Sequence, residues 1–216
     1  MTQDLGLPPH ATAQKFIDAV AEMLKTTSYD KIKSNSVLLR SGLTRGPMYH
    51  HFEDFDDLIE SAQLQIYKEF ASGVADTYLN LFTNYSDPGE VRGRMNDPIY
   101  RQVIGNTSVI RWQCIGALDK AASSTRFRKK FMKLHEEITL KWIKIYEISA
   151  ERGWADPTIS PRAFAYMMEA STLGRIYDDI SPIKLADDEW VEIGIQLIES
   201  FLLKSVPRSE SQEPAI

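Results

Sequence analysis

The residues best suited to specific chemistry lie in one short stretch, positions 41–52, which reads SGLTRGPMYHHF. It contains a lone arginine, Arg45, and an adjacent histidine pair, His50 and His51. An arginine side chain can donate two parallel hydrogen bonds to a planar acceptor. The histidines could be taken for metal ligands, but adjacent helical residues do not face each other, and no His or Cys lies three or four positions away. We therefore expect hydrogen-bonding recognition here, and no metal site.

No pattern typical of an enzyme is found elsewhere in the chain. The segment 135–137, His-Glu-Glu, lacks the second histidine at helical spacing that zinc peptidases require. Cys114 lies among apolar residues, which favours a small buried side chain over a nucleophile. No nucleophile elbow, phosphate loop or paired carboxylates can be argued from spacing. We predict a protein that is not an enzyme and that uses no cofactor.

The composition is that of a soluble globular protein. Of 216 residues, 43% are hydrophobic and 25% are charged, and no apolar run approaches the roughly 18 residues of a membrane span. The first ten residues lack the basic start and apolar core of a signal peptide. A single cysteine cannot form an internal disulfide. We expect a cytoplasmic protein without membrane contact.

The sign of the charge changes abruptly along the chain. The net charge is −5, which argues against non-specific coating of nucleic acid. Residues 15–52 nevertheless contain six basic and three acidic side chains, whereas residues 53–60 contain five carboxylates. A local positive field is therefore expected before Phe52 and a negative one after it.

The stretch at 41–52 must be positioned by the helices around it. Residues 1–11 form a loose arm, and helical spacing of apolar residues begins near Thr12, a possible N-cap of a first helix. A second helix spans 34–40 and ends at Gly42, which supplies the left-handed conformation of a tight turn. Thr44 can cap a third helix with Pro47 in its first turn. Helix, glycine turn and capped helix predict a helix-turn-helix.

The remaining chain reads as long amphipathic helices, so the predicted class is all-α. Asp54 can cap a fourth helix that continues to about residue 85, and a loop rich in Gly, Pro, Asn and Asp follows at 86–97. Helices are expected at 98–122, with a break near 105–106, and at 125–152, 161–177 and 187–204. The tail from 205 to 216 is expected to be disordered.

Basic residues at 126–133 are interleaved with phenylalanines, an arrangement with two readings. The run could attract acidic partners. The reading that we favour is the solvent-exposed face of an amphipathic helix.

A three-helix head followed by a long connecting helix and a larger helical body resembles the TetR family of bacterial transcriptional regulators. The family motif is a glycine, an aliphatic residue, Ser or Thr, two variable positions, a small residue, an aliphatic residue, Tyr, a variable position, His or Tyr, and Phe. The corresponding residues here are Gly42, Leu43, Thr44, Arg45, Gly46, Pro47, Met48, Tyr49, His50, His51 and Phe52. Pro47 replaces the small residue, and Phe55 stands where the family usually has a basic residue.

The resemblance implies a DNA-binding domain at 12–53 and a ligand-binding and dimerisation domain at 54–204. Arg45 is the side chain able to bond a guanine in two places, a contact that contributes roughly 1–3 kcal/mol of discrimination. The other reading is a capped surface helix whose Tyr49 and Phe52 are core anchors. Met48 and Phe52 are expected to be core residues in either reading. The predicted DNA-contacting residues are Lys33, Ser34, Asn35, Thr44, Arg45, Gly46, Pro47, Tyr49, His50 and His51.

The resemblance also implies an apolar pocket in the body whose ligand alters DNA binding. Candidate lining residues are aromatic or methionine, with one cation and one carboxylate as polar anchors: Met95, Arg111, Trp112, Trp142, Tyr146, Tyr166, Met167, Met168 and Glu169. Each of these residues could instead be plain core.

The last two helices have broad apolar faces with small residues that permit close approach. Pairing them with their copies predicts a homodimer in which two recognition helices lie about 34–36 Å apart, one turn of DNA. The predicted interface residues are Ser171, Gly174, Trp190, Gly194, Leu197, Ile198 and Phe201.

The hypothesis from the sequence is therefore a homodimeric repressor that binds a palindrome-like operator in double-stranded DNA and is released by a small apolar effector. The alternative is a helical ligand-binding or adaptor protein that has lost DNA binding. Phe55 and the adjacent acidic run motivate that alternative.

Overall fold

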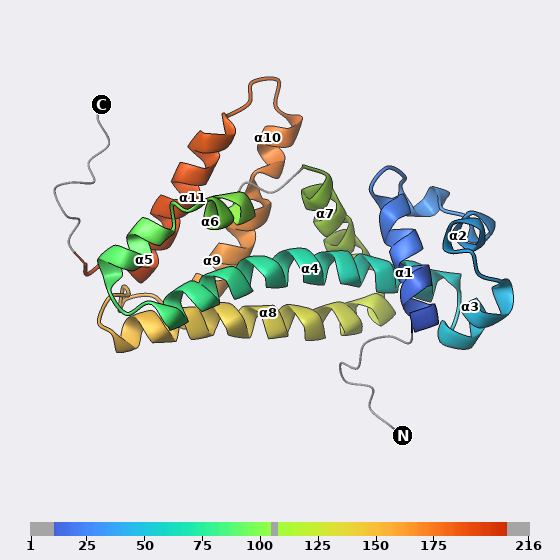
Figure 1. The fold of residues 1–216 in the computed structure, drawn as a ribbon, viewed down its shortest axis with the longest axis horizontal. Coiled ribbons are helices and arrows are strands. Elements are labelled where there is room, and N and C mark those ends of the chain that lie inside the picture. The colour runs from blue at the N-terminus through green and yellow to red at the C-terminus, as the bar shows by residue number, and fades with distance from the viewer. Residues whose placement is uncertain (1–10, 105–107, 207–216) are drawn as a thin grey trace.

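The computed structural model describes residues 11–104 and 108–206, and every regular element in those ranges is helical. No strand occurs in these ranges, which confirms the predicted all-α class. In chain order (Figure 1) the elements are α1 (Ala11–Leu24), the 3-10 turn η1 (Tyr29–Lys31), α2 (Ser34–Ser41), α3 (Arg45–His51), α4 (Phe55–Asn84), α5 (Pro88–Arg94), α6 (Pro98–Ile104), α7 (Ser108–Ser123), α8 (Thr125–Glu151), α9 (Pro161–Gly174), α10 (Ile176–Ile180) and α11 (Asp187–Leu202).

The first three helices pack with the beginning of α4 around a small apolar cluster. Phe16 and Val20 of α1, Val37 of α2, Met48 of α3 and Phe52 are its main members. The rings of Phe16 and Phe52 meet edge to face, with their centroids 6.4 Å apart. We call residues 11–53 the head. Its core is separate from that of the rest of the chain.

Gly42 makes the turn between α2 and α3 possible. Its φ is 68°, a left-handed conformation that glycine adopts without a steric penalty, and its N–H donates to the Leu38 carbonyl at 3.1 Å. Thr44 occupies the N-cap position of α3, but its side chain makes no capping bond to the described backbone of α3. The predicted cap bond is therefore wrong. Thr44 is exposed, so water can hydrate its hydroxyl instead.

The 30-residue helix α4 belongs to both apolar clusters. Leu58 and Ala62 pack in the head, whereas Tyr78 and Leu81 pack in the second, larger cluster. As predicted, Asp54 caps the helix, because its carboxylate accepts the Asp57 N–H at 2.6 Å. Helix α4 therefore runs from the head into the rest of the protein, which we call the body (Figure 1).

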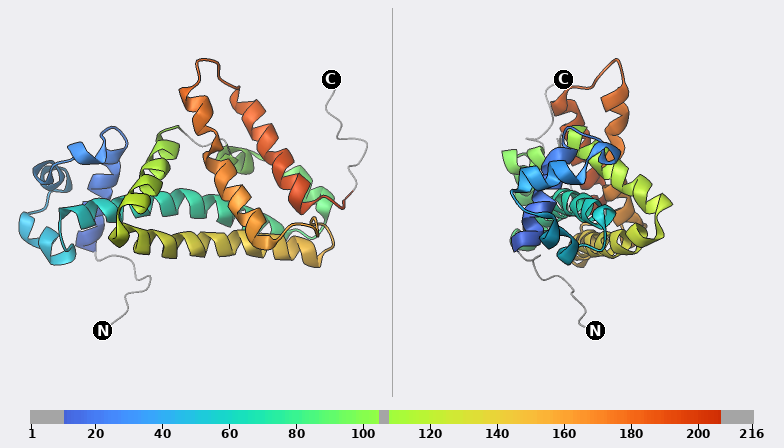
Figure 2. Two further views of the ribbon diagram at one scale, coloured as in Figure 1. Left: turned by 180° about the vertical axis from the view of Figure 1, so that it is seen from behind. Right: turned by 90° about the vertical axis from the view of Figure 1, so that its right-hand side faces the viewer.

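In the body, α8 lies beside α4 and runs in the same direction (Figures 1 and 2). The apolar face predicted for α8 forms the centre of the body, with Phe127, Phe131, Ile138 and Trp142 nearly inaccessible to solvent. Helices α7, α9 and α11 also pack against this cluster. The loop between α10 and α11 projects away from α4 and α8 (Figure 2).

The segment predicted as a loop at 86–97 contains helix α5, so that part of the prediction is wrong. Its start has the expected signals of a helix, with Pro88 in the first turn and the Asp87 carboxylate accepting the Glu90 N–H at 2.7 Å. Tertiary contacts hold it: Arg92 is buried and lies 3.3 Å from Glu199 of α11.

Several predicted boundaries also shift. Helix α1 already begins at Ala11, so Thr12 lies inside its first turn and is not the cap. The helix predicted for 161–177 ends at Gly174, which has the lowest helix propensity of the residues after Pro161, and α10 follows. Most of the predicted N-terminal arm (1–10), the break near 105–106 and most of the tail (207–216) lie outside the described residues. Of the predicted tail, Ser205 donates its N–H to the Trp154 carbonyl at 3.0 Å.

Candidate nucleic-acid interface

The exposed surface of α3 lies at the outer end of the head, away from the body (Figure 1). Met48 and Phe52 anchor the helix, being 0% and 6% exposed respectively. The opposite face presents Arg45, Gly46 and Tyr49 to solvent. A seven-residue helix fixed in this way is a narrow, rigid element that can enter a groove.

Arg45 is positioned by a bond between the two helices of the motif. Its guanidinium nitrogen donates to the Asn35 side-chain oxygen at 3.0 Å, and both residues are exposed. One N–H of the guanidinium is used in this bond, and an arginine has five. The bond limits the freedom of a long side chain, so less entropy is lost when the guanidinium binds a partner.

The first turns of α2 and α3 flank this arginine with groups suited to phosphate. Lys33 occupies the N-cap position of α2, where it is exposed, and Ser34 is the first residue of the helix. Thr44 precedes α3 and is also exposed. A hydroxyl, an ammonium and the N–H groups of a helix N-terminus are typical phosphate contacts in protein–DNA interfaces.

Gly46 leaves the N-terminal turn of α3 open. A Cβ placed on Gly46 would meet no other atom of the described structure within 4 Å. Helix packing within the protein therefore gives no reason for glycine at this position, where alanine would favour the helix. The close approach of another molecule's surface would explain a glycine at this position. The remaining predicted contacts, Pro47, Tyr49, His50 and His51, lie along the same short helix.

Three carboxylates of the acidic run after Phe52, those of Asp54, Asp57 and Glu60, pair with basic side chains of α8. Arg126 contacts the Asp54 carboxylate at 2.8 Å and the Glu60 carboxylate at 3.1 Å. Lys130 contacts Asp57 at 2.5 Å and Glu60 at 3.5 Å. The Arg126 hydrogen bond, with the Asp57 N–H, lowers the pKa of Asp54. We call these five residues the clamp.

Most of the basic run at 126–133 lies on the exposed face of α8, as the favoured reading expects. Arg126 and Lys130 belong to the clamp, and Arg128 donates to the Ala121 carbonyl near the end of α7 at 2.7 Å. The contacts of Arg126 and Lys130 fasten the start of α8 to the start of α4. Arg128, Lys129, Lys130 and Lys133 are exposed, and Arg126 is partly buried.

Phe55, which stands where a basic residue was expected, packs partly buried against the head cluster. It contributes to the apolar core and not to a positive surface.

The residues predicted to line one ligand pocket are distributed over several environments. Trp112, Tyr166 and Met167 are about half exposed, whereas Met95 is fully buried. Tyr146 donates its hydroxyl to the carbonyls of Asp156 and Ile159, at 2.6 and 2.8 Å. The structure does not bring the predicted set together.

Both predicted polar anchors have partners within the protein. Arg111 is 3% exposed and donates through Nε to Asp179 of α10 at 2.8 Å, with a second bond from the same guanidinium to the other carboxylate oxygen. Glu169 accepts the Thr139 hydroxyl at 2.8 Å and lies 2.6 Å from His135 Nε2. Bonding to Glu169 raises the pKa of His135.

Two of the predicted ligand residues, Trp142 and Met168, do share a cavity of about 160 Å³ in the body. Most of the residues predicted for the dimer interface line the same cavity: Ser171, Gly174, Trp190, Gly194, Leu197 and Ile198. Phe201 lies elsewhere, with its ring centroid 5.9 Å from that of Phe164.

Sequence reasoning missed Tyr78, whose side chain lines this cavity from α4. It is 0% exposed, and its hydroxyl has no hydrogen-bond partner among the described residues. The cavity wall is mostly apolar, and its Ser171 and Thr172 hydroxyls donate to the Met168 carbonyl, which leaves the Tyr78 hydroxyl as a polar group without a described partner there.

Comparison with known proteins gives fold neighbours only. No protein-family model matches the chain, and no curated protein matches it. A TetR-family transcriptional regulator from Mesorhizobium loti superposes with a TM-score of 0.66 at 13% identity, covering 91% of this chain and 98% of that one. A TetR-family regulator from Cytophaga hutchinsonii gives a TM-score of 0.64 at 15% identity, with 94% and 100% covered.

The chain has the TetR fold. A transcriptional regulator from Saccharomonospora viridis, solved in complex with choline, superposes with a TM-score of 0.65 at 11% identity, covering 87% of this chain and 95% of that one. The predicted resemblance to the TetR family is thus confirmed at the level of the fold. The superpositions cover nearly the whole length of these neighbours, so both the head and the body of this chain correspond to the TetR fold. No described helix of the chain is long and apolar enough to cross a membrane.

Proposed function

We propose that this protein is a transcriptional regulator, a homodimeric repressor that binds a palindrome-like operator through α2 and α3 and is released by a small apolar molecule. The observation that carries the proposal is Arg45, exposed at the start of α3 and held by Asn35 at 3.0 Å. The TetR fold of the whole chain supports it. In this proposal residues 12–53 are the DNA-binding domain and residues 54–204 the ligand-binding and dimerisation domain.

The charge distribution supports DNA binding despite the net charge of −5. Asp54, Asp57 and Glu60 are neutralised by Arg126 and Lys130 within the clamp. Their field therefore opposes a phosphate backbone near α3 less than the sequence suggests.

Exposed apolar side chains support a dimer through the α9 to α11 region. Around the projecting loop between α10 and α11, Tyr177 is 77% exposed, Ile180 66% and Ile183 84%. Such a group of large apolar side chains on a protruding segment is typical of a surface that another chain covers. These residues extend the predicted interface of α9 and α11.

The cavity around Trp142, Met168 and Tyr78 is the proposed effector site. Its lining residues include the aromatic side chains of Tyr78, Trp142 and Trp190 and no carboxylate. We propose an apolar effector that carries one hydrogen-bonding group for the Tyr78 hydroxyl. Because this cavity also contains residues of the proposed interface, a bound effector would alter the packing of α9 and α11.

A selection from a randomised duplex pool tests DNA binding. We expect the purified protein to enrich a two-fold symmetric sequence whose half-sites are one helical turn apart. The affinity for that sequence should fall steeply as salt rises, because phosphate contacts release counterions. Retention of no duplex at low salt would favour the alternative, a helical ligand-binding protein without DNA binding, for which Phe55 in place of a basic residue is the supporting observation.

Arg45→Ala should relax the preference at one or two base pairs in each half-site, with a loss of roughly 1–3 kcal/mol of discrimination. The physical reason is the loss of the bidentate donor at the start of α3. Competition binding against single-base variants of the selected duplex measures the effect. Lys33→Ala is the matched control, since a phosphate contact should weaken binding to all sequences alike. If Arg45→Ala left the base preference unchanged, Arg45 would not be the residue that contacts the bases.

Gly46→Ala should stabilise the protein by about 0.5–1 kcal/mol and yet weaken DNA binding. The added methyl group meets nothing inside the protein, but it occupies the space into which the DNA surface must fit. Thermal unfolding and duplex titration measure the two effects. Gly73→Ala on α4, also open to a Cβ, should stabilise without changing affinity. If Gly46→Ala and the wild type bound DNA with equal affinity, a close contact between DNA and α3 at this position would be contradicted.

A further inference from the structure

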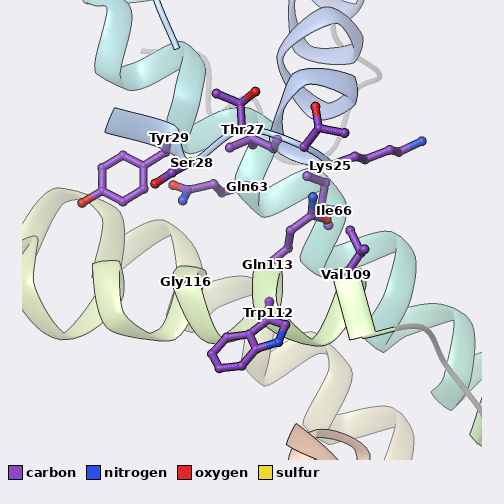
Figure 3. Close-up of a pocket in the computed structure, with 12 residues that line it drawn as sticks. Lys25, Thr27, Ser28, Tyr29, Gln63, Ile66, Val109, Trp112, Gln113 and Gly116 are labelled. Carbon is purple, nitrogen blue, oxygen red and sulfur yellow. The ribbon is translucent and has the colours of Figure 1, made fainter. Parts of the chain in front are cut away.

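A second cavity, of about 470 Å³, lies where the head meets the body. Figure 3 shows its walls: the segment from Lys25 to Tyr29 of the head, Gln63 and Ile66 of α4, and Val109, Trp112, Gln113 and Gly116 of α7. We call it the junction cavity. Its volume is in the range of small-molecule sites, and it is separate from the cavity around Tyr78.

Two side-chain amides in this wall have unsatisfied hydrogen-bonding atoms. Gln63 is 7% exposed, and its Oε1 is buried without a partner among the described residues. The Nε2 of Gln113 is likewise buried without a partner there. Both side chains extend from their helices toward the cavity (Figure 3). The two helices thus supply one acceptor and one donor that the protein itself does not use.

Buried polar groups without a hydrogen-bond partner destabilise a folded protein, so their presence in a cavity wall needs a reason. Water can occupy a cavity of this size and bond to both amides. A ligand with matching groups would displace that water and reproduce its bonds, which is the favourable case for binding.

The rest of the wall indicates which ligand fits. Leu24, Ile66 and Val109 are apolar, Thr26, Thr27 and Ser28 add hydroxyl groups, and no carboxylate lines the cavity. Lys25 lies at the wall but is paired with Glu22 at 2.5 Å, so its charge is compensated. The site therefore suits an uncharged molecule with an apolar body, an N–H for Gln63 and an acceptor for Gln113.

From this geometry we infer that the junction cavity is a second ligand site, specific for small uncharged ring compounds that carry both an N–H donor and a carbonyl acceptor. A ring of this kind would contact the Lys25 to Tyr29 segment of the head and α7 of the body at once. A bound ligand would therefore hold the head fixed relative to the body. The site does not depend on DNA binding or on the effector cavity.

Calorimetric titration of the full chain with quinolin-2-one tests the assignment. This bicyclic lactam has an N–H next to a carbonyl, N-methylquinolin-2-one lacks the donor, and naphthalene lacks both groups. We expect saturable binding of one quinolin-2-one per chain, at least tenfold tighter than that of either comparison compound. Equal affinity for all three, or no saturable heat, would overturn the assignment.

Variants locate the binding. Gln63→Leu should weaken quinolin-2-one binding at least tenfold and leave the melting temperature equal or higher, because an unsatisfied amide is replaced by an apolar group of similar size. Gln113→Leu is a second variant with the same expected loss. Tyr78→Phe, in the other cavity, should leave the affinity unchanged. Loss of binding in Tyr78→Phe with retention in both glutamine variants would place the ligand elsewhere and refute the proposal. No DNA is present, so the outcome is independent of operator binding.

Discussion

Asp179→Ala is expected to lower the free energy of unfolding by about 3–5 kcal/mol, because it removes one partner of a buried ion pair. The side chains of Arg111 and Asp179 are 3% and 8% exposed, and two hydrogen bonds join them. Chemical denaturation followed by circular dichroism measures the change. The matched control is Asp188→Ala, whose carboxylate is 93% exposed and pairs with Arg101 at 3.0 Å. That exposed pair should contribute less than about 1 kcal/mol.

The same pair predicts a pH dependence. Bonding to Arg111 lowers the pKa of Asp179 in the folded state. In the unfolded chain an aspartate titrates near 3.9. Its contribution is therefore fully present above about pH 4 and is lost as the pH falls through the lower folded-state pKa. Asp179→Asn should lose less stability than wild type on acidification. If both fell equally, Asp179 would not be the group responsible.

Arg126→Met should lower the free energy of unfolding by about 2–4 kcal/mol. It removes the nearest cation from Glu60, a carboxylate that is 2% exposed, and also the bond to Asp54. Lys130 and Lys120 remain at 3.5 and 3.9 Å from Glu60, which keeps the loss below that of a fully unpaired charge. Lys129→Met, an exposed site on the same helix, is the control for the loss of one positive charge.

A double-mutant cycle separates the ion pair from simple packing. Adding Glu60→Leu to Arg126→Met removes the buried charge as well, so much of the lost stability should return. Strictly additive losses would show that Arg126 and Glu60 do not act as a pair. The clamp would then depend on the contacts of Arg126 with Asp54 and of Lys130 with Asp57.

Sequence patterns predicted the head well because its determinants are local. A glycine turn, apolar residues at helical spacing and an N-capping aspartate act over a few residues, as at Gly42 and Asp54. The buried anchors Met48 and Phe52 followed from the same spacing. The arrangement of Arg45 on Asn35 was not predictable in this way, because it depends on the angle between two helices.

The partners of charged residues could not be predicted from the sequence. Arg111 and Asp179 are 68 positions apart, and Arg126 and Asp54 are 72 positions apart. Nothing in a local pattern distinguishes a ligand anchor from one half of a buried ion pair. The same limit applies to the cavities, whose walls combine side chains of helices distant in sequence. Helix α5 was missed because its composition is that of a loop and its contacts are tertiary.

The length of α4 has a mechanical consequence. A helix of 30 residues is roughly 45 Å long. Its first turns are part of the head core, its last third lies at the Tyr78 cavity, and the clamp ties the start of α8 to its start. The two parallel helices, α4 and α8, therefore move together as one rigid unit. A tilt of only about 5° at the body end of such a rod displaces its other end by about 4 Å, which is comparable to the rise of one base pair along DNA.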